Sequence, residues 1–251
     1  ILDMVIKYTE VGKPELDDVY SSTTTVNRAG DQLEFFVKDL IAGSLEVNSK
    51  EDKVSRHNRI FSWLGSRNNP PDMMIESAEA IEVKKCRYSS NVQLNSSTPH
   101  HKLHLEDSRI TEDAKRCEDW TEKDMVYVIG NTEGSQVKKL WVTYGDCWGD
   151  SSSRYDDLAK LISSKISEGV EELEYGNLDT EDTNEIGKVF DVDPAKRTKL
   201  RIRGMWIITH PEKCFSDYIE DYEKKVQKRN PLFFIVRKSR YKGFPESQRK
   251  R

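Results

Sequence analysis

Residues 71–85, which read PDMMIESAEAIEVKK, constrain the fold more than any other part of the chain. Two short runs suited to strands, residues 73–76 and 80–84, stand on either side of a three-residue connection, and this pattern predicts a β-hairpin. Apolar and charged side chains alternate in the second run, which is typical of a strand with one covered face. We therefore expect an α/β fold in which this hairpin belongs to a buried sheet.

Side chains on the strand expected at 80–84 point to alternate faces. Glu82 and Lys84 therefore share one face, and Ile81 and Val83 share the other, which should be buried. Asp72 stands at the start of the partner strand, where the hairpin can bring it beside Glu82. The pattern thus predicts two carboxylates and one ammonium group at one end of the sheet.

Asp72, Glu82 and Lys84 match the pattern PD…(D/E)xK, and their groups suit metal-assisted hydrolysis of a phosphodiester. Carboxylate oxygens hold Mg²⁺, which keeps most of its waters, whereas His or Cys ligands would indicate zinc. The ion activates a water and offsets charge, while a lysine can position that water or stabilise the phosphorane. Surface hairpins with solvated charges also meet this pattern, so the rest of the sequence has to decide.

One helix before the hairpin is predicted by apolar residues at the spacing i, i+3, i+4, i+7 and i+8, namely Leu33, Phe36, Val37, Leu40 and Ile41. Its expected N-cap is Asp31 and its expected stop is Gly43. Similar patterns predict further elements, which are helices at 111–120, 155–174 and 212–227 and strands at 125–129, 137–144, 200–208 and 232–236.

Breaker-rich or acidic segments between these elements are interpreted as loops, at residues 21–30, 66–71 and 176–193. The predicted fold class is α/β, with a central mixed β-sheet flanked by helices. We expect a single domain over residues 1–251, with a basic C-terminal extension at about 224–251.

Charge is distributed unevenly along the chain. The net charge is −4, but residues 224–251 hold 11 Lys and Arg residues against one acid, Glu246, so the remainder is at −14. A basic end suits contact with DNA phosphates, because each neutralised phosphate releases counterions. A solvated tail that aids solubility is the competing interpretation.

Cysteine and histidine patterns do not indicate zinc. The four cysteines form no C-x-x-C pair and no disulfide framework, and no Cys or acid stands at a matching metal-ligand spacing from His100, His101 and His104. The sequence has no run of about 18 apolar residues and no signal-peptide pattern, so we expect no membrane partner and a cytoplasmic location in a prokaryotic cell.

A resemblance to NgoPII-type restriction endonucleases, members of the PD-(D/E)xK nuclease superfamily, is carried by PPDMMIESAEAIEVKKCRYSSNVQLNSSTPHHKL. The family's first helix is similar to AGDQLEFFVKDLIAG, and its later elements are similar to EDWTEKDMVYVIG, LWVTYGDCW and LRIRGMWIITHP. The resemblance covers about residues 27–215. It implies a restriction-endonuclease-like core and a homodimeric type II enzyme that needs Mg²⁺, and no nucleotide cofactor, to cut a short palindromic site in double-stranded DNA. By the same resemblance, that site is expected to be GGCC.

Carried over residue by residue, the resemblance assigns catalysis to Asp72, Glu82 and Lys84, and metal binding to the two acids among them. Glu34 resembles the acid on the first helix that assists the metals, although a plain surface acid fits its position equally well. Lys85 follows the triplet but faces the other side of the strand, so we interpret it as a packing or backbone residue.

Side chains that can read base edges are dense directly after the expected catalytic strand, namely Arg87, Asn91, Gln93, Asn95, Ser96, Ser97, His100, His101 and Lys102. They are close in sequence to the catalytic strand, and the family has a similar Asn-Ser-Ser run. We therefore predict that they face DNA, with an ordinary polar loop as the alternative. Arg201 and Arg203 share one face of the strand expected at 200–208, where DNA contact and salt bridging are equally plausible. The tryptophans stand mostly within apolar runs and are assigned to the core.

Three other functions share parts of this pattern. A repair or recombination nuclease of the same superfamily would read DNA structure instead of sequence. A DNA-binding module with a decayed site would keep the hairpin without catalysis. An enzyme acting on a small phosphate ester is disfavoured by the polar segment after the strand and by the basic C-terminal end.

Overall fold

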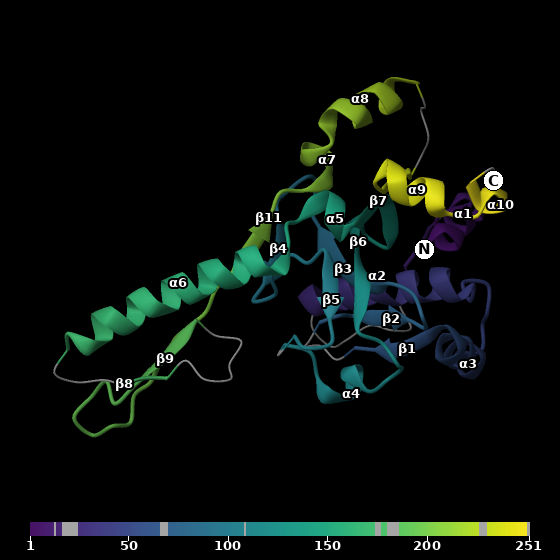
Figure 1. Ribbon diagram of the computed structural model, residues 1–251. Coiled ribbons are helices and arrows are strands. Elements are labelled where there is room, and N and C mark those ends of the chain that lie inside the picture. Colours follow the sequence, from purple (N-terminus) through teal and green to yellow (C-terminus); the bar gives the residue numbers. More distant parts are fainter. Residues whose placement is uncertain are drawn as a thin grey trace.

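The computed structural model describes residues 1–12, 14–16, 25–65, 70–107, 109–173, 177–179, 186–225 and 230–249. Its centre is a seven-stranded sheet in the order β1–β2–β3–β6–β7–β12, with β5 paired to β6 (Figure 1). These strands are β1 (Phe61–Leu64), β2 (Met73–Ile75), β3 (Ala80–Cys86), β5 (Lys102–His104), β6 (Glu122–Glu133), β7 (Gln136–Tyr144) and β12 (Leu232–Ile235). The pairs β3–β6 and β7–β12 are parallel and the others antiparallel. The predicted α/β fold with a central mixed sheet is confirmed.

The hairpin expected at 71–85 is present as β2 and β3. Met73 pairs with Ile81 in antiparallel register. A hydrogen bond from Ile75 N to Glu79 O, at 2.9 Å, closes the connection. The register places the predicted catalytic residues at the end of the hairpin that lies away from this turn.

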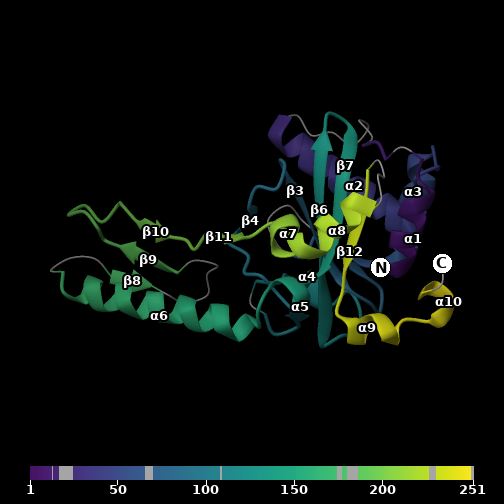
Figure 2. The ribbon, with the colours of Figure 1, turned by 90° about the horizontal axis from the view of Figure 1, so that it is seen from above.

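Three helices cover one face of the sheet, α1 (Leu2–Glu10), α2 (Thr25–Ala42) and α3 (Lys50–Ile60) (Figure 2). Met4 and Leu33 from the helices pack with Ile81 and Val83 of β3 in a buried apolar cluster. The expected burial of this face of β3 is therefore confirmed. The C-terminal helices α9 (Lys238–Gly243) and α10 (Glu246–Arg249) end beside α1, where Gln248 donates a hydrogen bond to Asp3 at 3.0 Å.

The other face is covered by four helices, α4 (Glu112–Lys115), α5 (Gly145–Trp148), α7 (Pro211–Cys214) and α8 (Ser216–Lys225). Ala114, Trp148 and Ile219 from these helices pack with Met125 and Trp141 from the sheet in a second buried cluster. Trp120 is also buried, so three of the five tryptophans are core residues as predicted. No helix in the described ranges is long and apolar enough to cross a membrane.

Close packing of α2 on β6 fixes the helix relative to the β2–β3 hairpin. A Cβ atom at Gly130 of β6 would lie 2.5 Å from Cδ2 of Leu33, so a side chain there would push the buried leucine of the helix out of its position. Gly43 follows the helix with φ of +66°, a conformation that favours glycine, and is the stop that the sequence predicted. This packing carries Glu34, the next residue on α2, toward the end of the sheet.

An arm projects from the core beside β4 and β11 (Figures 1 and 2). It consists of α6 (Ser152–Glu171) and an antiparallel sheet of β8 (Asn177–Asp179), β9 (Gly187–Phe190) and β10 (Leu200–Ile202). Two further strands, β4 (Val92–Asn95) and β11 (Trp206–Ile208), pair where the arm joins the core. The arm therefore begins directly after α5 and returns to the core through β11.

Several predicted boundaries are wrong. The helix expected before the hairpin is α2, which starts at Thr25 and not after an N-cap at Asp31. Residues 25–30 are therefore helical where a loop was expected. The acidic loop expected at 176–193 contains β8 and β9, which the sequence concealed because these strands are short and have few apolar residues. Residues 21–24 and 66–69, within two other expected loops, lie outside the described residues.

Three expected elements are broken or shortened. The strand expected at 200–208 is divided into β10 and β11, because the chain leaves the arm sheet and joins β4 in a second sheet. The helix expected at 212–227 is interrupted at Phe215 into α7 and α8. The helix expected at 111–120 is limited to the single turn of α4.

A buried charge network joins α2 to α3. Asp39 accepts hydrogen bonds from Lys53 at 2.6 Å and from Ser44 at 2.7 Å, and it lies 2.7 Å from Nε2 of His57. All four side chains are buried. Burial raises the pKa of Asp39, but hydrogen bonds from His57, Lys53 and Ser44 outweigh that effect and hold this pKa below its usual value. The carboxylate is therefore the anion around which the contact between the two helices is organised.

Asp39→Ala is expected to lower the free energy of unfolding at neutral pH by about 3–5 kcal/mol, because it removes the buried carboxylate to which Lys53, Ser44 and His57 are bonded. Urea denaturation measures this loss. The carboxylate's contribution is complete above its unfolded pKa of about 4 and is lost as the pH falls through the lower folded pKa, so the difference from wild type should shrink in acid. Asp113→Ala, at an exposed acid on α4, is the control and should change stability by less than about 0.5 kcal/mol.

Candidate active site on the β2–β3 hairpin

The hairpin holds Asp72 beside Glu82. Antiparallel pairing of Met73 with Ile81 sets the preceding residue, Asp72, opposite the following one, Glu82. Oδ2 of Asp72 accepts a hydrogen bond of 2.6 Å from the backbone N–H of Val83. The neighbouring backbone is fixed as well, because Gly65 N donates to Asp72 O at 2.8 Å. The carboxylate is thus tied to β3 by its own oxygen and by the register of the strands.

Glu82 and Lys84 form an ion pair on one face of β3, as the alternation predicted. Nζ of Lys84 lies 2.5 Å from Oε1 of Glu82. The Glu82 side chain is buried, and its other oxygen, Oε2, has no hydrogen-bond partner in the described part of the chain. A buried carboxylate oxygen without a donor is costly, so this atom has an unmet need for a proton or a cation.

Glu34 reaches the same end of the sheet from α2. Its negative charge raises the pKa of Asp72 and of Lys84, which places it near both. Its Oε1 also accepts from Nζ of Lys38, one turn further along α2, at 2.5 Å. The structure therefore brings together all four residues predicted for catalysis and metal binding, and it adds Lys38, which the sequence analysis did not single out.

The electrostatics of this group follow from burying several acids together. Burial raises the pKa of Asp72 to about 8, the charges of Glu82 and Glu34 add to the rise, and Lys84 opposes it. Burial by itself lowers the pKa of Lys84, but Glu82, Asp72 and Glu34 outweigh it and hold this pKa above its usual value. Lys84 is therefore positively charged at neutral pH, while Asp72 still largely holds its proton.

The acids fit a divalent cation with oxygen ligands, although they are not arranged as a complete site. Among the described residues, no group of three or more His, Cys, Asp or Glu side chains is placed to hold a metal ion. Glu34 is paired with Lys38 and so does not complete a set with Asp72 and Glu82. A cation between Asp72 and Glu82 would supply the missing partner of Oε2 and relieve the repulsion that raises the Asp72 pKa.

The polar segment that follows β3 presents most of its predicted DNA-contacting side chains to solvent. Gln93 and Asn95 on β4 are exposed, while Val92 and Leu94 between them are buried. The other exposed members are Arg87, Asn91 and Ser96, and Ser97 is half-buried. The sequence analysis missed β4, although the alternation of Val92 and Leu94 with polar residues is a strand signal.

His100 corrects the prediction for this segment. Its side chain is 2% exposed, and its backbone N–H donates to the hydroxyl of Tyr127 at 2.8 Å. Burial, and to a smaller extent Arg109, lowers the pKa of His100 to about 4, so the ring is neutral. A buried neutral ring cannot contact DNA without rearrangement. His101 is half-buried with a ring nitrogen 2.5 Å from Gly149 O, and Lys102 is paired with Glu122, so both already have protein partners.

Arg201 and Arg203 are exposed but are not brought to the hairpin. Arg201 lies on β10 in the arm, and Arg203 follows it in the connection to β11 (Figure 2). The C-terminal basic segment is partly used inside the fold. Arg240 donates to both carboxylate oxygens of Asp124, and Arg237 donates to the carbonyl of Asp146 at 2.6 Å.

A basic cavity of about 490 Å³ opens beside the end of β3. Its lining includes Lys85, Arg87, Asn91, Gln93 and Lys213. Burial, and then the charge of Arg87, lowers the pKa of Lys85, which shows that the two cations lie near each other. Lys85 was interpreted as a packing residue, but it is exposed and lines this cavity. Lys213 was missed because only the fold brings α7 to this place.

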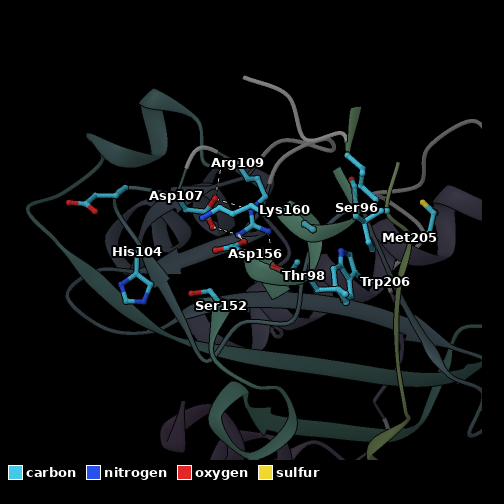
Figure 3. A pocket seen from close by; sticks show the side chains of 16 residues that line it. Ser96, Thr98, His104, Asp107, Arg109, Ser152, Asp156, Lys160, Met205 and Trp206 are labelled. Atoms are coloured by element: carbon cyan, nitrogen blue, oxygen red, sulfur yellow. Dashed lines mark hydrogen bonds and ion pairs between the residues drawn. The ribbon is translucent and has the colours of Figure 1, made fainter. Parts of the chain in front are cut away.

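A second cavity, of about 680 Å³, separates the core from the arm (Figure 3). Arg109 on its wall is held by both oxygens of Asp107, at 2.8 and 2.9 Å, and donates to Thr98 at 2.7 Å. Trp206 of β11 also lines this cavity. Its ring packs edge-on against Tyr155 of α6, with ring centroids 5.2 Å apart. The arginine is thus fully engaged with protein groups, and the tryptophan anchors the arm.

Asp72→Asn is expected to raise the free energy of unfolding by roughly 1–3 kcal/mol at a pH of about 8.5 in EDTA. The amide removes the repulsion with Glu82, and its oxygen can still accept from Val83 N. Because the folded pKa lies above the unfolded one of about 4, wild type loses stability as the pH rises from about 4 toward 8, so the gain should shrink as the pH falls and be nearly gone at about pH 3.5. Denaturant titrations at both pH values, with Asp113→Asn as control, would contradict this electrostatic account if Asp72→Asn were destabilising at the higher pH.

Comparison with known proteins agrees with the geometry of the hairpin. The family model described as NgoPII restriction endonuclease matches residues 1–251. The chain is 35% identical over 246 residues to the type II restriction enzyme NgoPII from Neisseria gonorrhoeae, an alignment that covers 97% of this chain and 85% of that protein. No solved structure gives a significant match. The match along its whole length shows that the chain belongs to the NgoPII restriction endonuclease family.

Proposed function

We propose that this restriction endonuclease hydrolyses phosphodiester bonds of double-stranded DNA at the β2–β3 hairpin, with Asp72, Glu82 and Lys84 as catalytic residues. The observation that carries the proposal is the group of two adjacent carboxylates and one charged lysine, in which a buried oxygen of Glu82 lacks a partner. Family membership supplies the reaction class, site-specific cleavage of DNA by a type II enzyme. The hairpin would be the site of this reaction.

Enzymes of this family generally use divalent metal ions, and we propose Mg²⁺ here because the available ligands are all carboxylate oxygens. Asp72 and Glu82 would hold the ion, and Glu34 would assist from α2. When bound, the ion lowers the pKa of a water and offsets charge on the phosphate. The protein itself would have to orient the scissile phosphate and keep the attacking water in line with it.

Lys84 is the group of this chain that can act on the phosphate. Its ammonium is charged at neutral pH and is held in place by Glu82 at 2.5 Å. It can donate to a non-bridging oxygen, where negative charge grows as water attacks phosphorus. The attacking oxygen forms the new bond and the bond to the 3′ oxygen breaks, so the products would carry 5′-phosphate and 3′-hydroxyl ends.

We also propose that two copies of the chain act on one palindromic site, because a two-fold symmetric sequence suits a two-fold symmetric protein with one active site for each strand. The proposed sequence is GGCC, and the proposed location is the cytoplasm of a prokaryotic cell. Exposed Arg87, Asn91, Gln93, Asn95 and Ser96 would face the duplex, while buried His100 is left out of this interface.

Lys84→Ala is expected to abolish cleavage of unmethylated phage DNA in Mg²⁺ while it leaves DNA binding in EDTA within about twofold of wild type. Loss of one charge-stabilising group typically costs on the order of 10²–10³ in rate. Lys115→Ala, at a partly exposed lysine on α4, should cleave normally. Agarose gels measure cleavage, and fluorescence anisotropy measures binding.

The band pattern of wild type in the same digest separates the possible functions. Discrete bands that end within GGCC support the full proposal. A smear would indicate a nuclease that recognises DNA structure or cuts without specificity. Uncut DNA with intact binding would indicate a binding module. Full cleavage by Lys84→Ala would remove this lysine from the mechanism.

The basic cavity provides a second expectation for DNA binding. Lys213→Ala should weaken the affinity for a duplex by about two- to tenfold and lower the slope of log K against log salt by about one, because one phosphate contact is lost. The affinity of Lys115→Ala should stay unchanged. An unaltered salt slope for Lys213→Ala would show that the cavity does not contact phosphate.

A further inference from the structure

The outward face of α6 has no partner within the described part of the chain. The helix contacts β8 and β9 of the arm along one side, and none of its residues is buried. The half-buried residues on that side include Tyr155, Ala159, Ile166 and Val170. The opposite stripe is exposed along its whole length and consists of Arg154, Asp157, Leu158, Leu161, Ser164, Lys165 and Glu168. We call these seven residues the outer stripe of α6.

Apolar side chains stand at the centre of this outer stripe. Leu161 is 56% exposed and Leu158 is 45% exposed, and Ile162 flanks them at 38%. Single exposed leucines are ordinary, and Leu158 and Ile162 also border the cavity between the core and the arm. Leu161, between the charged ends of the stripe, is a large apolar side chain that nothing in the described part of the chain covers. The charged residues lie toward the two ends of the stripe, so any partner has to match their order.

A second copy of α6 matches that order. If two copies pack antiparallel about a two-fold axis through Leu161, residues equally far from this centre on opposite sides face each other. Arg154 then faces Glu168 of the other copy, and Asp157 faces Lys165. The small side chain of Ser164 faces Leu158 and leaves room for it. Every charge in the outer stripe meets an opposite charge, and this occurs twice because of the symmetry.

The charges of the outer stripe are free to change partners at little cost. In the single chain, Arg154 pairs with Asp150 at 2.6 Å and Lys165 pairs with Glu168 at 2.7 Å. All four side chains are strongly exposed, and ion pairs of this kind contribute little to stability. Across a dimer, the same groups would instead flank a dehydrated apolar centre, where opposite charges fix the register of the two helices.

We propose that α6 is the dimerisation element of this enzyme and that the occupant of its outer stripe is the outer stripe of a second copy. The proposal rests on the proposed function in one respect, since cleavage of both strands of a palindrome calls for two active sites. From Arg154 to Glu168 the helix is only about 22 Å long. Two such stripes bury less than the roughly 1,600 Å² of a standard interface, so we expect a dimer that dissociates in the micromolar range.

Sedimentation velocity of the full chain over a range of concentrations tests this pairing. Arg154→Glu and Glu168→Arg should each weaken dimerisation by at least about tenfold, because each creates two pairs of like charges. The double variant restores both pairs with reversed signs and should recover affinity to within about threefold of wild type. Leu161→Glu, which places two carboxylates on the axis, should leave a monomer. Arg197→Glu is the matched control, since it reverses an exposed charge on the same arm away from the helix.

Circular dichroism of each variant shows whether α6 stays folded, so that a lost dimer is not confused with a lost helix. Wild type that remains monomeric up to roughly 100 µM overturns the proposal. Single variants that dimerise as well as wild type also overturn it, as does a double variant no better than either single one. The readout needs no DNA and no metal, so absence of cleavage would count against the hairpin site and not against this interface.

Discussion

The repulsion between carboxylates buried at the end of the β2–β3 hairpin is the constraint on which the site depends. Asp72 and Glu82 face each other because the strands are in antiparallel register, and Glu34 adds a third negative charge from α2. Two lysines offset this charge, Lys84 on Glu82 and Lys38 on Glu34. The chain thus holds acids in a buried place where their negative charges repel one another. A binding site for a cation is the expected reason for this unfavourable arrangement.

The rest of the core serves to hold that arrangement rigid. Leu33 of α2 packs against Gly130 of β6, and β6 pairs in parallel with the whole length of β3. Asp39 on the same helix then anchors α3 through Lys53. Helix, hairpin and central strand are therefore connected by contacts that leave little freedom, which is what a site built on repulsion needs if the acids are not to move apart.

The sequence predicted the hairpin and its face because both depend on local alternation. Ile81 and Val83 identify the buried side without knowledge of the fold. By contrast, His100 is buried where its backbone N–H bonds to the hydroxyl of Tyr127, which is distant in sequence, and a histidine within a polar run gives no sign of that partner. Lys213 escaped notice for the same reason. Patterns with a period of two or 3.6 report a residue's own strand or helix, not the neighbours that tertiary packing brings.

The arm shows the same limit of prediction from local sequence patterns. The sequence predicted α6, but its periodicity could not tell which side would meet the core. The structure shows that β8 and β9 cover only one side, and that the strand expected at 200–208 divides so that the chain can return through β11. A surface helix normally exposes a polar side, whereas the exposed side of α6 also carries Leu158 and Leu161. If the hairpin cuts DNA as proposed, a second copy would cut the second strand, and the outer stripe of α6 is the self-complementary surface proposed to recruit it.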